Sequence, residues 1–496
     1  MNTAEQWALA AVGLVCLVSV MVSFRGLRWS RSTSDVYVAS RGVSPMTNAS
    51  AIAGEYLSAA SFLGIAGLVL AYGSQGLWFP VGYTAGFLTL LLFVAAPLRR
   101  SGAYTVPDFL ALRFRSVQLR RFSVMVVVMT GWLYIVPQLH GASLALSTTT
   151  GLPGWAGPAV VVLVVLPVVL SGGMRSVTLV QAVQYWIKLT ALLVPAVFVL
   201  LRLGVPEAAD LPDLSGIWDS GMTPGGGTDA YRTASLVVAL MIGALGLPHV
   251  LVRFYTNPDG DSARRTTVLL LTLLSGFYLL PVILGTVARA VFPPEGPGGD
   301  PDAALLHLPG ELFGGAAADL LTALIAGGAF AAFLSTASGL VVSVAGALSQ
   351  EFFGGTVKGF RVGALLAVAL PLAAGTVTSQ LALAGAVAMV FTFAASSLSP
   401  VLLLGIWWRR LTVRAAATGM VTGGVVSLGS LMLGLVAGEE TGAAVLLYPA
   451  LWCIPLSFAV AVLTALLGRG GPPPHTGAVM SRLHTPEVAS SEVNRL

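Results

Sequence analysis

The sequence predicts an all-α integral membrane protein with about thirteen transmembrane helices. Of its 496 residues, 56% are hydrophobic and only 9% are charged, whereas a soluble domain carries about 25% charged residues. Apolar runs close to the roughly 20 residues that a spanning helix needs recur along almost the whole chain. These observations favour one helical bundle in a membrane over the about three soluble domains that length alone would predict.

The predicted spans follow one another at short intervals. The first has no basic segment before it and no clear cleavage site after it, so we interpret it as a retained helix and not a signal peptide. Cys16 and Cys453 both lie in apolar runs, so no disulfide framework is predicted. The spans begin near Trp7, Thr47, Leu77, Phe122, Trp155, Leu179, Thr233, Thr266, Ala316, Val362, Leu381, Ala415 and Ala443.

The basic residues predict how the spans are oriented. When the spans alternate across the bilayer, one set of loops holds little beyond Arg202, Arg232 and Arg289. Basic loops stay on the cytoplasmic side, so we expect a cytoplasmic-membrane protein with its amino terminus outside and its carboxyl tail inside. The basic set comprises Arg25, Arg28, Arg31, Arg41, Arg99, Arg100, Arg113, Arg115, Arg120, Arg121, Arg175, Arg264, Arg265, Lys358, Arg361, Arg409, Arg410 and Arg414.

We expect the chain to have four parts. An extra first helix covers 1–30, a ten-helix core of two inverted repeats covers 31–412, and two further helices cover 413–468. The polar tail over 469–496, which contains Pro and Gly, is predicted to be a disordered cytoplasmic segment. Two long outer loops, about 202–232 and 292–315, are predicted to be solvent-exposed caps, and we interpret their acids as a solvated surface in preference to a cation-attracting mouth.

The second span is interrupted in its middle. Residues 53–64 read Ala-Gly-Glu-Tyr-Leu-Ser-Ala-Ala-Ser-Phe-Leu-Gly, which places Glu55 at membrane depth beside Gly54. A charge there is costly and faces a cavity or a partner, and unwound backbone is tolerated there only where it lines a cavity in the protein. The alternative is a helix-packing face, for which Gly, Ala and Ser are also typical.

The seventh span carries a second interruption. Residues 243–249 include Gly243, Gly246 and Pro248, and a proline removes a backbone donor and frees a carbonyl. Spans two and seven correspond if two inverted repeats of five helices follow an extra first helix, and paired broken helices mark the binding site of a secondary transporter. This pairing favours a binding site over helix packing. Half-helix amino termini favour an anion and freed carbonyls favour a cation.

The ninth span places three uncharged oxygens on one side of a helix. Ser335 and Thr336 come one turn after Ala332, so two hydroxyls and one carbonyl are predicted to face one point. Such oxygens suit a weakly held alkali cation. The alternative is that both hydroxyls bond back to the preceding turn of their own helix, which this segment alone favours.

These motifs together resemble those of a known family. The segment 54–64 is similar to the second-helix motif of the solute:sodium symporters, in their cation/acetate symporter (acetate permease) branch. Further similar segments are 172–177 with Gln181, 246–254, 333–339 and 400–408, and the resemblance extends from about residue 35 to about residue 419. It implies a thirteen-span fold with a leucine-transporter-like core of five plus five inverted helices.

The resemblance also implies a sodium site. Carried over by motif position, its ligands are backbone oxygens of the broken second helix and a carbonyl with two hydroxyls of the ninth. Glu55 stands where the branch more familiarly has aspartate, so three roles stay open for it: tuning the cation site, pairing with a basic residue, or binding a proton. The implied sodium ligands are Gly54, Leu57, Ala332, Ser335 and Thr336.

A substrate region is implied between spans two, seven and eleven. No basic residue in these positions pairs obviously with a carboxylate, so we expect backbone donors at a broken helix to bind it. The amide of Gln138 equally suits a helix–helix hydrogen bond. The predicted substrate-binding residues are Glu55, Tyr56, Ser58, Ser61, Gln138, Ala244, Pro248, Ser396 and Ser397.

Other intramembrane polar residues receive structural interpretations. We expect Lys188 to extend its ammonium to the cytoplasmic interface. We expect His140 and His249 to link helices by hydrogen bonds, and Arg253 to belong to an inner gate.

The resulting hypothesis is a sodium-coupled symporter that imports a short-chain monocarboxylate such as acetate, propionate or pyruvate. Its expected partners are a small organic anion, sodium and the lipid bilayer, with no nucleic acid and no cofactor. No metalloprotease, phosphate-binding or serine-hydrolase motif indicates an enzyme. Three alternatives stay open: a same-fold symporter for an amino acid or sugar, a transporter-like sensor, and a passive channel.

Overall fold

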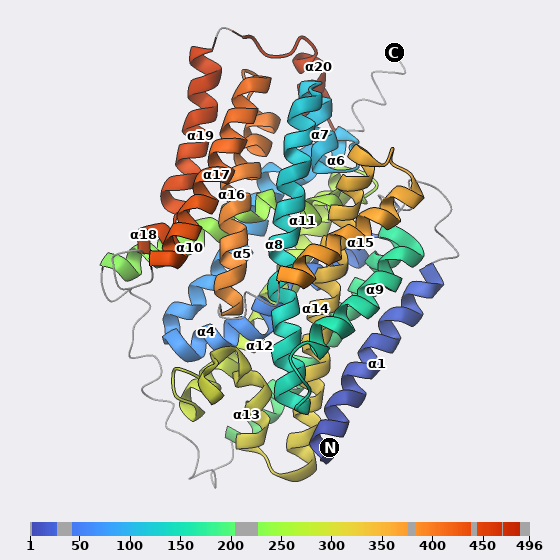
Figure 1. The fold of residues 1–496 in the computed structure, drawn as a ribbon, viewed down its shortest axis with the longest axis vertical. Coiled ribbons are helices and arrows are strands. Elements are labelled where there is room, and N and C mark those ends of the chain that lie inside the picture. Colours follow the sequence, from blue (N-terminus) through green and yellow to red (C-terminus); the bar gives the residue numbers. More distant parts are fainter. Residues whose placement is uncertain are drawn as a thin grey trace.

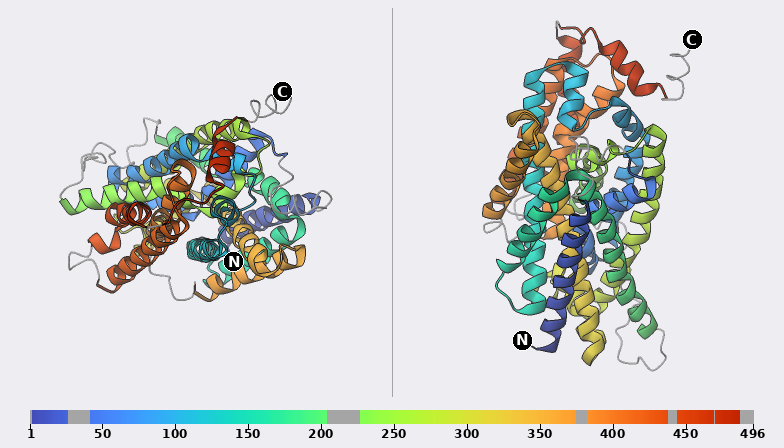
Figure 2. Two further views of the ribbon diagram at one scale, coloured as in Figure 1. Left: turned by 90° about the horizontal axis from the view of Figure 1, so that it is seen from above. Right: turned by 90° about the vertical axis from the view of Figure 1, so that its right-hand side faces the viewer.

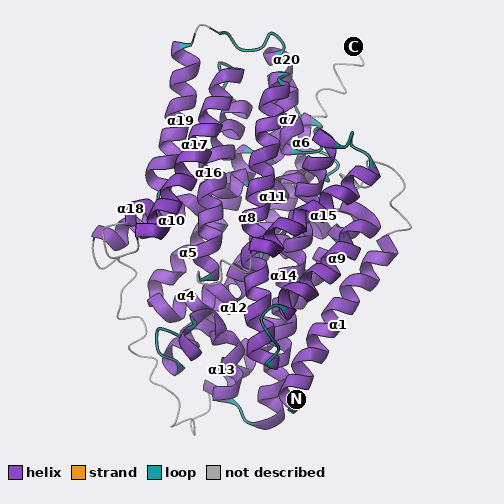
Figure 3. Cartoon of the chain, in the orientation of Figure 1, coloured by secondary structure: helices purple, strands orange, loops and turns teal. Residues whose placement is uncertain are grey.

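The protein is a bundle of helices in every part that the structure covers. The computed structural model describes residues 2–26, 42–203, 227–374, 382–437, 444–468 and 470–486. Within these ranges all regular elements are helical (Figure 3). The long helices run roughly side by side along the longest axis of the molecule (Figure 1). Arg28, Arg31 and Arg41, which contribute to the predicted orientation, lie outside the described residues.

The predicted spans are present as helices. Ten segments of the described chain are long and apolar enough to cross a membrane, and one of them, residues 60–93, contains two predicted spans that meet at the 3₁₀ turn η4 (Gly73–Leu77). The apolar helix Ala156–Ser171 and α15 supply the remaining two. The long helices are α1 (Thr3–Gly26), α5 (Trp78–Phe93), α8 (Val117–Thr150), α9 (Ala156–Leu203), α10 (Gly227–Gly243), α12 (Gly260–Val291), α14 (Gly315–Phe352), α15 (Val357–Ala374), α16 (Leu383–Trp407), α17 (Val413–Ala437) and α19 (Ala450–Leu467).

Shorter helices complete the two broken spans and cover the ends of the bundle. In the second span, α3 (Pro45–Tyr56) is followed by the π-helical turn η3 (Ala60–Gly64) and α4 (Ile65–Tyr72). In the seventh, α10 is followed by the 3₁₀ turn η5 (Ala244–Gly246) and α11 (Pro248–Phe254). The others are α6 (Ala95–Ser101), α7 (Val106–Phe114), the turns η6 (Pro297–Gly299) and η7 (Pro301–Ala303), α13 (Ala304–Leu312), α18 (Ala444–Leu447) and α20 (Thr476–His484).

The helix α14 forms the centre of the bundle. Nearly every residue from Ile325 to Ala347 is buried, and many of them are Gly, Ala or Ser. Small residues let helix backbones approach closely in a membrane: Gly328 lies against Ala191 of α9, and Gly131 of α8 lies against Val344. α14 therefore contacts α1, α8 and α9 along its length.

The predicted spans five and six form one bent element, α9. The bend falls at Gly173, whose φ of 56° and ψ of −149° lie outside the helical region. Only glycine adopts such a conformation without strain, which explains the Gly-Gly pair at the start of the segment 172–177. The second half of α9 then packs against α3 and α14, and this contact brings its polar residues to the helix break.

The prediction of a wholly disordered tail is wrong for its first part. α20 packs its buried face, which includes Val479 and Leu483, onto the end of the bundle at α6 and α7. Arg113 donates a hydrogen bond of 3.0 Å to Thr476 Oγ1, and Arg482 Nε donates one of 3.1 Å to Arg100 O. These apolar and charge-assisted contacts order the segment despite its polar composition. Residues 487–496 lie outside the described part.

The two ends of the bundle differ. The amino-terminal end of α1 and α13 lie at one end, and α6, α7 and α20 lie at the other, in both side views (Figures 1 and 2). The second end carries Arg99, Arg100, Arg113 and Arg482 on these helices. The amino terminus of α1 and the last described helix, α20, therefore lie at opposite ends of the bundle, as an odd number of spans requires.

Candidate functional site

The break in the second span exposes two backbone carbonyls inside the bundle. α3 ends at Tyr56, and Leu57 leaves the helical region with a ψ of 81°. The chain re-enters a helix through η3, a π-helical turn of a kind that is frequent at functional sites. Gln138 Oε1 of α8 accepts a 3.0 Å hydrogen bond from Ala59 N and so satisfies a donor that the break leaves free. The carbonyls of Gly54 and Leu57 point to partners on other helices.

The break in the seventh span lies beside the first. Leu247 is extended with a ψ of 109°, and Pro248 begins α11. Ser399 of α16 donates a 2.7 Å hydrogen bond to Ile242 O, and Gly246 lies against Ala394 O of the same helix. α16 therefore supports this break as α8 supports the other, and Ala244 and Pro248 are both buried.

A cluster of oxygens joins α3 to α14, which we call the cation-site oxygens: the carbonyls of Gly54, Leu57 and Ala332 and the hydroxyls of Ser335 and Thr336. Ser335 Oγ lies 2.6 Å from Gly54 O and 3.0 Å from Ala332 O. Thr336 Oγ1 donates a 2.6 Å hydrogen bond to Glu55 O. The structure thus brings the predicted residues together at the break in the second span.

Lys188 of α9 also reaches these oxygens. Its Nζ donates hydrogen bonds to Gly54 O, to Leu57 O at 2.8 Å and to Ser335 Oγ at 2.9 Å. The side chain is 0% exposed, so the expectation that it extends to the cytoplasmic interface is wrong. The helix face that carries Lys188 points into the bundle, because α9 packs against α3 and α14.

This arrangement does not fit a sodium ion at the same place. An ammonium has three donors and no acceptor, and here its three partners are three of the five oxygens predicted to hold sodium. An ion bonded to the same three oxygens would have to stand where Nζ stands. In this structure the amino group of Lys188 occupies the position among these oxygens.

A buried ion pair lies next to these oxygens. Arg253 Nε of α11 is 2.7 Å from Glu55 Oε2, and both side chains are 1% exposed. Arg253 Nη1 donates to Thr178 Oγ1 at 2.6 Å, and Nη2 donates to Gln181 Oε1. Gln181 Nε2 donates in turn to Ser335 O at 2.7 Å. One network therefore connects both broken helices with α9 and α14.

An aromatic cluster lies on the other side of the break. Tyr83 of α5 stacks on Tyr278 of α12 with ring centroids 5.9 Å apart, and Tyr56 packs edge-on against Tyr83 at 5.3 Å. Phe391 of α16 contacts Tyr83 at 5.2 Å, and Tyr134 of α8 at 6.0 Å. Five helical segments thus contribute rings to one buried cluster.

Several buried polar atoms in this region have no hydrogen-bond partner among the described residues. They include Glu55 Oε1, the hydroxyls of Tyr56, Ser58, Tyr83 and Tyr134, and both ring nitrogens of His249. His249 packs edge-on against Tyr134 at 5.3 Å. Because unsatisfied buried polar groups are rare and costly, this group of atoms marks a place where a polar ligand belongs. His249 does not make the helix-linking hydrogen bond that we expected of it.

The other predicted substrate residues divide into two groups. Ser61 Oγ lies 3.5 Å from the Tyr278 hydroxyl and so faces the aromatic cluster, whereas the buried Ser58 hydroxyl has no hydrogen-bond partner among the described residues. Gln138 is engaged with Ala59 N, as the helix-linking alternative expects. Ser397 bonds back to Phe393 O at 2.6 Å, and its Cβ lies toward Gly424 of α17, so the structure does not bring it to the cluster.

Of the tyrosines in the cluster, sequence reasoning identified Tyr56 but not Tyr83, Tyr134 or Tyr278. Tyr83, Tyr134 and Tyr278 come from α5, α8 and α12 and converge only in the fold. For Lys188 a signal existed, since an ionisable residue inside a span is a functional-site hypothesis by default. The interpretation of Lys188 as an interfacial residue set that signal aside.

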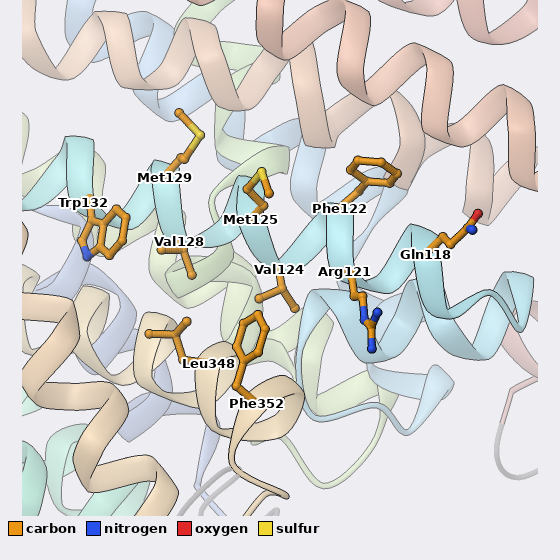
Figure 4. Close-up of a pocket in the computed structure, with 10 residues that line it drawn as sticks. All are labelled: Gln118, Arg121, Phe122, Val124, Met125, Val128, Met129, Trp132, Leu348 and Phe352. Atoms are coloured by element: carbon orange, nitrogen blue, oxygen red, sulfur yellow. The ribbon is translucent and has the colours of Figure 1, made fainter.

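Two hollows at the surface are distinct from this centre. One, of about 660 Å³, lies between α8 and α14 (Figure 4). Its lining includes Met125 and Phe352, which are 61% and 64% exposed, so we interpret it as a lipid-facing groove. The other, of about 390 Å³, lies between α4 and α10 and is lined by Arg232, Arg289 and Asp229 among others.

Comparisons of sequence identify related proteins over nearly the whole chain. The profile described as the Sodium:solute symporter family matches residues 36–423. An uncharacterized symporter of Bacillus subtilis, YwcA, is 29% identical over 487 residues, which cover 92% of this chain and 93% of that protein. A monocarboxylic acid transporter of Corynebacterium glutamicum is 29% identical over 497 residues, covering 91% and 90%.

Solved structures show the same fold. A Na⁺-coupled sialic acid symporter in a substrate-bound outward-open state superposes with a TM-score of 0.74 at 14% identity, covering 94% of this chain and 99% of that one. Mhp1, a nucleobase-cation-symport-1 family transporter, superposes in a closed conformation with a TM-score of 0.52 at 12% identity, covering 90% and 98%. The likeness confirms a leucine-transporter-like fold.

Proposed function

The chain belongs to the Sodium:solute symporter family, and from this premise we propose that it imports a short-chain monocarboxylate by cation-coupled symport. Acetate, propionate and pyruvate are the candidate substrates, as in the acetate permease branch. Membership of the family supports sodium as the coupling ion. The relative named as a monocarboxylic acid transporter supports the substrate class.

The observation that carries this choice of substrate is a buried lysine at the breaks whose hydrogen-bond partners are all uncharged. Arg253 is paired with Glu55, whereas Lys188 is held by neutral oxygens only. The three ionised groups leave one net positive charge in a buried place. A charge at membrane depth requires a partner, and a monovalent anion supplies one. Lys188 supplies this charge nearby, while its three N–H donors stay bonded to Gly54 O, Leu57 O and Ser335 Oγ.

The aromatic cluster fits the other end of such a substrate. Tyr56, Tyr83 and Tyr278 provide apolar ring surface suited to a small apolar tail, and the unpartnered hydroxyls of Tyr56 and Tyr83 suit a carboxylate. A site lined mainly by apolar surface with a few placed polar groups is typical of small-molecule binding. The predicted residues Glu55, Tyr56, Ser58, Ser61, Ala244, Pro248 and Ser396 remain the proposed substrate-binding set, with Tyr83, Tyr134 and Tyr278 added.

Alternating access follows from the two breaks. α3 and α11 are the half-helices on the side of α6, α7 and α20, and the Glu55–Arg253 pair ties them together. Asn48 Nδ2 adds a 3.2 Å hydrogen bond to Arg253 O. We propose that this end is cytoplasmic, because basic residues are retained inside, and that the pair separates when the inner path opens.

Uptake into proteoliposomes tests the proposal. Radiolabelled acetate should accumulate in a saturable way under an imposed cation gradient, with propionate and pyruvate as competitors and glucose and proline without effect. Strong inhibition by proline or glucose, with none by propionate, would transfer the assignment to a same-fold symporter for another solute. Non-saturable flux without counterflow would indicate a channel.

A further inference from the structure

We infer that Lys188 is a tethered cation which takes the place of sodium among the cation-site oxygens, so that transport does not use sodium bound there. What this inference implies for transport rests on the proposed function, because it concerns the ion that the symporter uses. The contacts of Lys188 on which it is based do not depend on the identity of the substrate.

The donors of the Lys188 ammonium match the oxygen acceptors around it. The ammonium has three N–H donors, and its three partners are Gly54 O, Leu57 O and Ser335 Oγ. Ser335 Oγ accepts from Lys188 and lies within donating distance of Gly54 O and Ala332 O. Every donor of the ammonium is therefore satisfied by an oxygen that the break in α3 or the helix α14 presents.

Charge also opposes sodium at these oxygens. With Lys188, Arg253 and Glu55 all ionised, the buried groups around the breaks sum to one positive charge. A sodium ion added among the same oxygens would raise the sum to two in a buried place. Like charges a few ångströms apart repel strongly in such a medium. Sodium and the Lys188 ammonium therefore exclude one another at this site.

Lys188 also joins the helices that a bound ion would join. An ion held by both α3 and α14 would join the broken helix to the centre of the bundle. Lys188 joins these helices from a third, α9, through its bonds to Leu57 O and Ser335 Oγ. The neighbouring residues on α9 are fixed: Gln184 bonds to Ser19 Oγ at 2.9 Å, and Tyr185 bonds to Leu273 O at 3.1 Å. The covalent tether thus supplies permanently what an ion supplies reversibly.

Binding of radioactive sodium to the purified full-length protein tests the inference without any substrate. The wild type should bind no sodium at these oxygens, and Lys188→Ala should gain saturable binding, because the substitution frees Gly54 O, Leu57 O and Ser335 Oγ. Adding Ser335→Ala to Lys188→Ala should weaken the gained binding about fivefold or more, since one ligating oxygen is lost. The chain's other lysine, Lys358, is exposed on α15, and Lys358→Ala is the matched control that should gain nothing.

Two results would overturn the inference. One is saturable sodium binding by the wild type that Ser335→Ala weakens. The other is a folded Lys188→Ala protein, shown by size exclusion and thermal unfolding, that binds no more sodium than the wild type. If Lys188→Ala misfolds, the wild type and Ser335→Ala alone still decide the matter through the first result.

Uptake under separate gradients then connects the inference to transport. Acetate uptake by the wild type should not depend on sodium at the cation-site oxygens, so Ser335→Ala should leave any sodium dependence of uptake unchanged, while an imposed proton gradient serves as the comparison arm. Acetate uptake that requires sodium and responds to Ser335→Ala would overturn the inference and leave the proposed substrate intact. Failure to transport any monocarboxylate under any gradient would instead overturn the proposed function, while the binding experiment would still judge Lys188.

Discussion

Replacing Glu55 by glutamine tests the ion pair that joins α3 to α11. Glu55 Oε2 lies 2.7 Å from Arg253 Nε, and both side chains are 1% exposed, so solvent does not screen the interaction. Glutamine has the same length and keeps an acceptor oxygen, but it removes the negative charge. The substitution therefore separates the need for charge from the need for a hydrogen bond.

The expected loss in the free energy of unfolding depends on which partners Arg253 keeps. Removing one member of a buried ion pair costs about 3–5 kcal/mol, because the other charge stays buried and uncompensated. Arg253 keeps its hydrogen bonds to Thr178 and Gln181 in the variant, so we expect the lower end, about 3 kcal/mol, or roughly a hundredfold in the folding equilibrium. Glu55→Asp retains the charge with a shorter side chain and should cost about 1 kcal/mol.

The assay is unfolding of the purified protein in detergent, combined with acetate uptake. Glu55→Gln should unfold more readily than Glu55→Asp and lose most uptake, while Glu55→Asp keeps substantial activity. The double variant Glu55→Gln/Arg253→Met should be less destabilised than the sum of the single effects, because the pair interacts directly. A Glu55→Gln protein with wild-type stability and uptake, or additive effects in the double variant, would refute the reasoning.

Three further predictions address other parts of the molecule. Burial raises the pKa of the Asp302 carboxyl, which accepts a 2.7 Å hydrogen bond from Leu383 N, from 3.8 to about 7. The folded state then holds a proton that the unfolded state releases, so the free energy of unfolding should fall by up to about 1.4 kcal/mol per pH unit as pH rises from about 4 to 7. A pH titration of unfolding should lose this slope in Asp302→Asn. Gly173→Ala should lower the melting temperature, because alanine at a φ of 56° carries a backbone strain of about 1 kcal/mol or more. Gly276→Ala in α12 is the control and should be neutral or stabilising, because an added Cβ there meets nothing within 4 Å. Equal effects of the two substitutions would contradict the account of the bend in α9. Tyr83→Phe should leave thermal stability unchanged, because its hydroxyl has no partner among the described residues, yet raise the KM for acetate up to about tenfold; an unchanged KM would remove Tyr83 from the substrate site.

The sequence was informative about the membrane fold because the signals that specify it are local. Apolar runs of spanning length predicted the helices, and Gly and Pro within such runs predicted both breaks, at Leu57 and at Leu247. The convergence of Ser335 with Gly54 also followed from motif positions. Each of these features depends on residues close together in the sequence or on one pairing of helices.

The remaining features depend on how helices face one another. Lys188 lies on a helix whose polar face the sequence alone could not orient, and its reach suits either an interface or a buried site. Tyr83, Tyr134 and Tyr278 belong to three helices with no motif in common. The helix α20 looked disordered by composition, and its order depends on apolar packing and hydrogen bonds to the end of the bundle, such as the one from Arg482 to Arg100 O.

The central claim is that the cation-site oxygens hold the Lys188 ammonium in place of a free ion. An experimental density map of the wild-type protein, prepared in a sodium-containing buffer and resolved well enough to show ordered ions, tests it most directly. The account predicts continuous side-chain density that ends among Gly54 O, Leu57 O and Ser335 Oγ. Separate ion density among these oxygens, with the Lys188 side chain turned away from them, would contradict it.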